Sequence, residues 1–265
     1  MRNVTSKGSE LTRLEPGEYG TVSGLVDSKY PNLAFVYGVL EGNIPGKVWA
    51  RHEQGEIKAA LVETNSSFCF SLGSVTQSLF TEFQSLVEMK SSVKLVHPSM
   101  CVAVGNEANR RGFSEAERFH FTLEGTGNIP SSVCDLPDGF TVKRIDENLF
   151  EMLNWREMVL QIFGTAKNYL QNGFGFCLLH GDSVVAEAHG VVGGSFVELG
   201  IYTHPAYRRQ GLPLIVMAET ARLGATRGLT TVVSCDKETT ATVSVSLRLG
   251  MRWDFAYKVA RRTAI

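Results

Sequence analysis

The chain has 265 residues, a formal net charge of −1, and 43% hydrophobic and 20% charged residues. These are the proportions of a globular protein, and the length allows one large domain or two small ones. The near-zero charge argues against a nucleic-acid-binding protein and against a polybasic membrane-surface protein. No apolar run reaches 18 residues, so we expect no membrane span.

The N-terminus and the cysteines both favour a cytoplasmic protein. Residues 1–20 lack the apolar segment of a signal peptide. The five cysteines are scattered, odd in number and without a C-x-x-C pair, which predicts neither a disulfide framework nor a metal site.

A loop-like segment divides the sequence near its middle. Residues 126–139 contain two prolines, two glycines and several small polar residues. We therefore expect an N-terminal α/β domain over residues 1–130 and a second domain over residues 138–265.

The first half reads as a mixture of helices and strands. Its expected elements in chain order are a mainly helical segment over 17–41 interrupted near Pro31, strands at 47–51, 57–63 and 67–73, a helix at 78–90, and strands at 92–97 and 118–124.

The second half has a clearer pattern. Its expected elements are a strand at 140–145, helical structure over 147–170, strands at 175–180, 183–192 and 195–203, a helix at 212–227, a strand at 230–235, a helix at 240–250 and a strand at 253–261. Gly193-Gly194 is a favoured two-residue loop for a hairpin between the two strands that flank it.

The segment from Glu198 to Pro213 is the most informative one. It is read as a strand, a turn and the start of an apolar helix, with Arg208, Arg209 and Gly211 in the turn. Free amides at a helix start, two cations and a glycine that permits close approach would suit a pyrophosphate. An ordinary strand–helix turn with solvated arginines is the alternative reading of this loop.

The order of elements and this loop resemble the GCN5-related N-acetyltransferase (GNAT) family over residues 140–261. Arg208-Arg209-Gln210-Gly211-Leu212-Pro213 resembles the family's acetyl-CoA motif R/Q-x-x-G-x-G/A. The longer stretch from Glu198 to Leu212 is similar to a branch that includes the zwittermicin A resistance acetyltransferase. Residues 234–236, 249–251 and 38–49 also resemble that branch.

The resemblance implies an α/β (α+β) GNAT fold with a central mixed, mostly antiparallel sheet. The first half would be a degenerate GNAT-like repeat that supplies the acceptor side. Acetyl-CoA would lie in a split between the fourth and fifth strands of the second half and would be held without a metal. The residues so implied in acetyl-CoA binding are Ile201, Tyr202, Thr203, Arg208, Arg209, Gln210, Gly211, Leu212, Pro213 and Thr239.

Three positions depart from the family pattern. Pro213 stands where the motif has Gly or Ala, and proline has no N–H for a phosphate. Thr239 stands where members often have Asn, and Ser246 stands where many have a tyrosine acting as general acid.

Acetylation of an amine needs a base and an acid. Glu198 is the candidate base, and a Gly193-Gly194 loop would place His189 opposite it across the hairpin as a relay. An ordinary polar pair on an exposed face is the alternative. Tyr257 is the candidate acid, with Ser246 as the second.

The resemblance implies an acetyl-CoA-dependent N-acetyltransferase that acts on a primary amine of a small molecule, and the similar branch suggests an antibiotic-like metabolite as that molecule. Two alternatives stay open. One is a non-catalytic GNAT-fold protein that binds acyl-CoA or a metabolite, and the other is an acyltransferase for longer acyl groups or protein amines. The sequence does not indicate the oligomeric state.

Overall fold

The computed structural model describes residues 11–96, 112–130 and 136–263. Twelve strands in these residues form one mixed sheet with the order β1-β2-β3-β4-β5-β12-β6-β11-β10-β9-β8-β7. Only the pairs β4–β5 and β10–β11 are parallel. The predicted fold class, a mixed and mostly antiparallel sheet, is therefore confirmed.

The first-half elements have the following bounds: β1 Leu11–Arg13, η1 Pro16–Leu25, α1 Leu33–Leu40, β2 Gly46–Glu53, β3 Glu56–Thr64, β4 Phe68–Gly73, α2 Gln77–Val87, β5 Ser92–Val96 and β6 Ser114–Leu123. The second-half bounds are β7 Phe140–Arg144, α4 Glu147–Phe150, α5 Arg156–Phe163, α6 Ala166–Asn172, β8 Gly173–His180, β9 Ser183–Gly193, β10 Phe196–Thr203, η3 Pro205–Tyr207, α7 Pro213–Thr226, β11 Thr230–Asp236, α8 Thr240–Arg248 and β12 Arg252–Thr263.

Local chemistry sets the ends of several helices. The Thr76 side chain accepts a hydrogen bond from the Leu79 amide and caps α2, whose apolar stripe is buried. The segment expected to be helical over 17–41 is a 3-10 helix followed by α1, and Asn32 between them has a left-handed φ of 58°. The segment expected to be helical over 147–170 is three short helices, and Gly164 ends the second with a φ of 78°.

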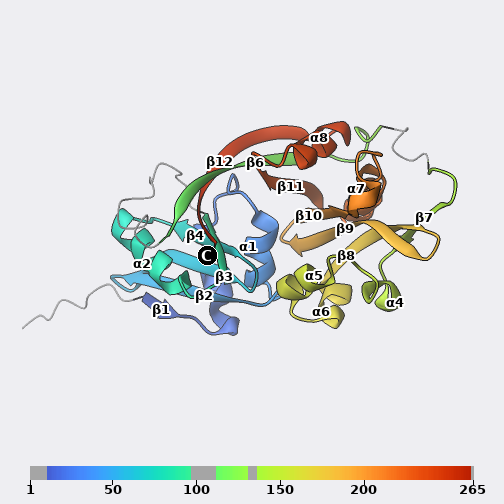
Figure 1. The fold of residues 1–265 in the computed structure, drawn as a ribbon. Helices are drawn as coiled ribbons and strands as arrows, with labels where there is room; N and C mark the ends of the chain where they lie inside the picture. The colour runs from blue at the N-terminus through green and yellow to red at the C-terminus, as the bar shows by residue number, and fades with distance from the viewer. Residues whose placement is uncertain (1–10, 97–111, 131–135, 264–265) are drawn as a thin grey trace, which may run out of the picture.

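The two halves repeat the same strand topology. In each half, antiparallel strands lead to a parallel pair, β4–β5 in the first and β10–β11 in the second, with a helix between the paired strands. The sixth strand of each half is exchanged: β12 pairs with β5, and β6 pairs with β11. The two exchanged strands also pair with each other, and Figure 1 shows them side by side between the two halves.

Three hydrophobic clusters follow this arrangement. One packs α2 on first-half strands, and a second packs α7 on second-half strands. The third joins α1, α5 and α6 to strands of both halves, and it includes Val36, Phe70 and Phe163. The halves are thus joined by a shared core as well as by the sheet.

The hairpin between β9 and β10 differs from the prediction. Its loop is Gly194-Ser195, so His189 pairs with Gly200 and Glu198 pairs with Val191. Gly193 belongs to the strand because α1 packs closely against it. A Cβ there would lie 2.2 Å from the Ala34 carbonyl oxygen and 2.3 Å from the Gly38 nitrogen. Gly193 is therefore a glycine because α1 packs against it. Gly194 is a glycine because it lies in the turn, where φ is 56°.

Two expected absences can be examined only in the described residues. No helix there is long and apolar enough to cross a membrane. Cys69, Cys177 and Cys235 are buried free thiols, and Cys101 and Cys134 lie outside the described residues.

Candidate active site

A fork opens in the sheet where β10 and β11 stop pairing. The parallel register joins Phe196–Glu198 to Thr230–Val232, after which both strands continue without pairing to each other. Glu198 is therefore at the vertex of the fork.

A cleft of about 530 Å³ lies beside the outer part of this fork. Ile201, Tyr202 and Thr203 line one side, and residues of α8 line the other. Arg208, Arg209 and Arg248 also line it and give it positive charge. The cleft thus has a strand edge for an extended chain and cations for an anionic group.

The loop before α7 has a backbone suited to an anion. Arg209 and Gly211 both have left-handed φ values, 65° and 78°. The amides of Leu214 and Ile215 bond to carbonyls within the loop, whereas those of residues 209–212 have no such partner in the described structure. Free amides beside a helix N-terminus favour a phosphate group, so these residues fit the pyrophosphate of a coenzyme A thioester.

The corresponding fork in the first half is filled. The Tyr30 hydroxyl bonds to the carbonyl oxygens of Ser71 and Val96, and Ser71 Oγ also donates to Val96. The connection from β4 to α2 spans only residues 74–76, so it has no room for a loop like that of residues 204–212. The two forks therefore differ: the second-half fork is open beside a cleft, and the first-half fork is closed by these hydrogen bonds.

A second cavity of about 320 Å³ lies on the inner side of the fork. Its wall combines first-half residues, among them Phe35 and Phe68, with Glu198 and His189 from the second half. Trp155 lines both this cavity and the cleft, so the two spaces adjoin at its side chain. The arrangement would bring two molecules together at the vertex of the fork.

Glu198 is a buried carboxyl group at the vertex of the fork, in the wall of the inner cavity. Its side chain is 5% exposed, and Oε2 is buried without a hydrogen-bond partner in the described residues. Burial raises the pKa of the carboxyl group to about 7, although the Arg118 charge and the hydrogen bond from Asn32 oppose that shift. A carboxyl group with this pKa can accept or donate a proton near neutral pH.

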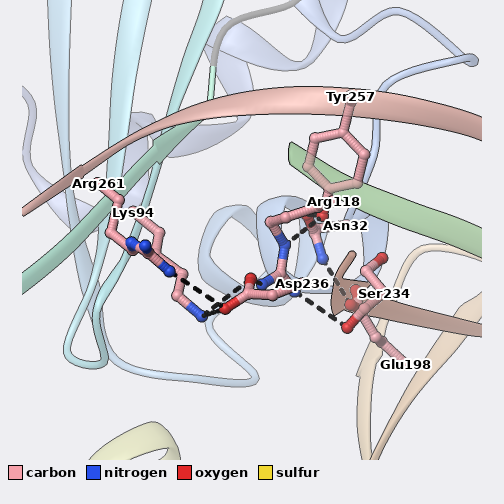
Figure 2. Close-up of polar contacts among 8 residues, drawn as sticks. All are labelled: Asn32, Lys94, Arg118, Glu198, Ser234, Asp236, Tyr257 and Arg261. Carbon is pink, nitrogen blue, oxygen red and sulfur yellow. Dashed lines mark hydrogen bonds and ion pairs between the residues drawn. The ribbon is translucent and has the colours of Figure 1, made fainter. Parts of the chain in front are cut away.

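A buried polar network holds the other oxygen of Glu198. Asn32 Nδ2 donates to Oε1, while Asn32 Oδ1 accepts a hydrogen bond of 2.8 Å from the Tyr257 hydroxyl. The Tyr257 oxygen accepts in turn from Arg118 Nε at 2.9 Å. Figure 2 shows this chain from Tyr257 through Asn32 to Glu198. Each member fixes the orientation of the next.

His189 belongs to a neighbouring group on β9. Its Nδ1 lies 3.1 Å from the Tyr169 hydroxyl, and its Nε2 lies 3.8 Å from Glu187 Oε1. Glu187 is fully buried and accepts hydrogen bonds from the amides of Asn154 and Trp155. This carboxylate therefore anchors the segment that carries Trp155 between the two spaces.

These features of the fork agree with the comparisons to known proteins. A family model described as GNAT acetyltransferase matches residues 27–260. The chain belongs to the GNAT acetyltransferase family. It is 26% identical over 274 residues to the uncharacterized N-acetyltransferase YdfB of Bacillus subtilis (strain 168), with 95% of this chain and 98% of that protein covered.

Solved GNAT structures share the fold along most of the chain. The GCN5-related N-acetyltransferase-like protein of Streptococcus suis 89/1591 aligns with a TM-score of 0.71 at 21% identity, over 93% of this chain and 99% of that one. A tandem GNAT protein from the clavulanic acid biosynthesis pathway aligns with a TM-score of 0.57 at 12% identity, over 95% and 96%. At these identities the likeness shows the GNAT fold alone.

The structure groups most of the residues predicted to bind the coenzyme. Those that line the cleft beside the outer part of the fork are Ile201, Tyr202, Thr203, Arg208, Arg209, Gly211 and Pro213. Gln210 is exposed in the loop, and Leu212 is buried in the core beneath α7. Thr239 lines the inner cavity instead of the cleft.

The predicted catalytic residues fall in different places. Glu198 and His189 line the inner cavity and lie on one face of the sheet, diagonally rather than directly opposite. Tyr257 is buried in the network described above, and Ser246 is buried in α8 with no hydrogen-bond partner among the described residues. Neither Tyr257 nor Ser246 lines the cavity or the cleft.

Four residues of the site were missed by sequence reasoning: Asn32, Arg118, Trp155 and Asp236. Asn32 follows a proline in a segment read as helical, and asparagine is one of the few residue types that readily adopt the left-handed backbone found there. Arg118 follows Glu115 and Glu117 in a strand of mixed polarity, so no sequence signal indicated that its charge would be buried. Asp236 lies in the stretch 234–236 that carries part of the sequence resemblance, but no sequence signal indicated a role for its carboxylate or for Trp155.

In the part of the chain that the structure describes, no group of three or more His, Cys, Asp or Glu side chains could hold a metal.

Proposed function

We propose that this protein is an acetyl-CoA-dependent N-acetyltransferase that acts on a primary amine of a small molecule. The observation that carries the proposal is the position of Glu198. A buried carboxyl group with a pKa of about 7 lies at the vertex of the fork, in the wall of a cavity that adjoins the coenzyme cleft.

The proposed transfer is a direct one. Glu198 Oε2 takes a proton from the bound ammonium group, directly or through a water molecule, and leaves a neutral amine. The amine nitrogen then attacks the thioester carbonyl, the C–N bond forms, the C–S bond breaks, and the thiolate leaves and takes up a proton. Much of the rate gain would come from holding both substrates at the fork.

The remaining predicted residues receive proposed roles from their contacts. Tyr257 is better suited to positioning than to acid catalysis because its hydroxyl hydrogen is directed to Asn32. Ser246 lines neither the cleft nor the inner cavity, so its hydroxyl group is not placed to contact either substrate. His189 lines the cavity with its ring held by the Tyr169 hydroxyl and without a hydrogen bond to Glu198, so it is suited to shape the cavity wall beside the proposed base.

The division of labour between the halves is also part of the proposal. Residues 138–265 provide the coenzyme cleft, and residues 1–130 provide Phe35, Phe68 and Lys94 to the acceptor cavity. The resemblance to the zwittermicin A resistance branch motivates tests with antibiotic-like amines, for which the sequence remains the only support.

The test is Glu198→Gln, which keeps the shape and the hydrogen bond from Asn32 but removes the proton acceptor. We expect kcat to fall about 10²- to 10⁴-fold with the Kd for acetyl-CoA unchanged. Thiol release across a panel of amines and calorimetry with coenzyme A provide the measurements. Undiminished thiol release from the variant would overturn the role of Glu198.

A non-catalytic coenzyme-binding protein is the second candidate, and Pro213 favours it. This residue lines the cleft at the first position of α7 without an N–H to offer a phosphate. Tight binding of coenzyme A with no thiol release on any amine would support this candidate, whereas release would exclude it.

A further inference from the structure

The inner cavity has a cluster of cations in one wall. Lys94 Nζ lies 3.3 Å from Asp236 Oδ2, Arg118 forms an ion pair with the same carboxylate, and Arg261 Nη1 lies 3.8 Å from it. Figure 2 shows Lys94 and Arg118 reaching Asp236 from opposite sides. Three cations thus share one carboxylate, and Lys94, Arg118 and Asp236 itself all line the cavity.

Arg118 uses its N–H donors in hydrogen bonds to other residues of the protein, whereas Lys94 has donors that are still available. The Arg118 guanidinium donates to Tyr257, to Asp236 and to the Ser234 carbonyl oxygen. Lys94 Nζ carries three hydrogens, and Asp236 is its only hydrogen-bond partner in the described residues. The ammonium group can therefore donate to a molecule in the cavity.

The positive charges of Lys94 and Arg118 lie close to each other. Both lie over the ring of Phe68, with Lys94 Nζ 5.4 Å and Arg118 Cζ 5.2 Å from its centroid. Burial lowers the pKa of Lys94, and the nearby Arg118 charge lowers it further. A second anion beside Lys94 would relieve this repulsion.

The facing part of the cavity wall is apolar. It is formed by Phe35 and by residues of α5 and its N-terminal flank, namely Trp155, Met158, Val159, Ile162 and Phe163. Glu198 lines the cavity from β10, the strand between β9 and β11, and it belongs to the same hydrogen-bond network as Arg118. The cavity thus combines a proton acceptor, a cationic group and an apolar surface.

We propose that the inner cavity binds an acceptor that carries a carboxylate and an apolar group besides its amine, with Lys94 as the residue that binds the carboxylate. This inference rests on the proposed function, which assigns the amine to Glu198. An amino acid with an aromatic or aliphatic side chain has this chemistry. An acceptor with several amines and no anionic group would place further positive charge beside Lys94 and Arg118.

The first experiment measures binding without turnover. Calorimetry compares 3-phenylpropionate with 3-phenylpropanamide, which differ in the carboxylate alone. We expect the acid to bind about 10- to 100-fold more tightly, as for a charge-assisted hydrogen bond. Equal binding of the two compounds, or binding of neither, overturns the proposal.

Variants assign the preference to Lys94. Lys94→Gln should abolish the preference for the acid, and Lys94→Arg should retain most of it. Arg261→Gln is the matched control, because it removes a cation from the same Asp236 cluster but its side chain does not line the cavity. A preference that survives in Lys94→Gln, or that Arg261→Gln removes equally, also overturns the assignment.

A second experiment separates this inference from the proposed function. Thiol release from acetyl-CoA is compared for phenylalanine and phenylalaninamide, and we expect a higher kcat/KM for phenylalanine that Lys94→Gln reverses. If the acid binds preferentially but no amine is acetylated, the carboxylate site stands and the acetyltransferase proposal fails. If amines are acetylated with no preference for the carboxylate, the acetyltransferase proposal stands and the carboxylate site fails.

Discussion

The side-chain amide of Asn32 donates a hydrogen bond to Oε1 of Glu198, although the two residues are 166 positions apart in sequence. Asn32 lies just before α1 in the first half, and Glu198 lies at the vertex of the fork in the second. The ionisation of the proposed base is thus governed partly by a residue of the other half, because a donated hydrogen bond stabilises the carboxylate.

The first prediction concerns this hydrogen bond. Asn32→Gly removes the donor and tolerates the left-handed φ of 58°. A hydrogen bond to a charged group contributes about 1.5–3 kcal/mol, so the pKa of Glu198 should rise by about one unit or more. The acid limb of the pH profile of kcat/KM should move upward by the same amount.

The control for that experiment is Asn43→Ala, which removes an asparagine that lines neither space. Its pH profile should match that of the unaltered protein. An unshifted profile in Asn32→Gly would show that Glu198 does not control the acid limb.

The second prediction concerns stability and pH. The folded-state pKa of Glu198, about 7, is above its ordinary value of 4.5. The folded state therefore binds this proton more tightly than the unfolded state does. As pH rises from about 4.5 to 7, the proton is lost and the free energy of unfolding of the protein falls. Above pH 7 the total loss in the free energy of unfolding that this shift causes is about 3 kcal/mol.

Denaturant unfolding at several pH values tests this sign. Relative to the unaltered protein, Glu198→Gln should gain stability as pH rises through this window and should gain none below it. A stability difference that does not change with pH would contradict the raised pKa.

The third prediction concerns the loop before α7. Gly211→Ala places a Cβ at a φ of 78°, and the strain should displace the loop amides and weaken coenzyme A binding about tenfold. The matched control is Gly228→Ala, which has a similar φ of 72° at the other end of α7 and open space around it. Calorimetry with coenzyme A should separate the two variants, and equal affinities would exclude the loop from binding.

The fourth prediction concerns the contact between α1 and β9. Gly193→Ala would place a Cβ 2.2 Å from the Ala34 carbonyl oxygen, so α1 must move away. We expect a loss of about 1–3 kcal/mol in the free energy of unfolding and, since α1 follows Asn32, a lower kcat. Gly127→Ala, with nothing near its added Cβ, is the control and should leave both quantities nearly unchanged.

The sequence predicts the local elements well and the long-range contacts poorly. The strands around the fork were predicted within a few residues because alternation and apolar runs are local signals. The partnership of Asn32 with Glu198 has no local signal, since it depends on packing α1 against β9 and β10.

The hairpin shows a different kind of failure. Gly193-Gly194 fits a turn by its composition, but packing against α1 requires a glycine at position 193 in the strand. The loop therefore moved by one residue, and His189 and Glu198 became diagonal neighbours. A glycine pair has two physical explanations, and only the tertiary structure separates them.

The exchange of β6 and β12 has a consequence for synthesis on the ribosome. β5 acquires its antiparallel neighbour only when β12, residues Arg252–Thr263, has left the exit tunnel. Until then the nascent first half has an open sheet edge at β5, and β6 can pair with β11 but lacks β12 on its other side. Completion of the first-half sheet is thus deferred until β12 has been made, and a premature stop before Arg252 would disable the first half as well as the second.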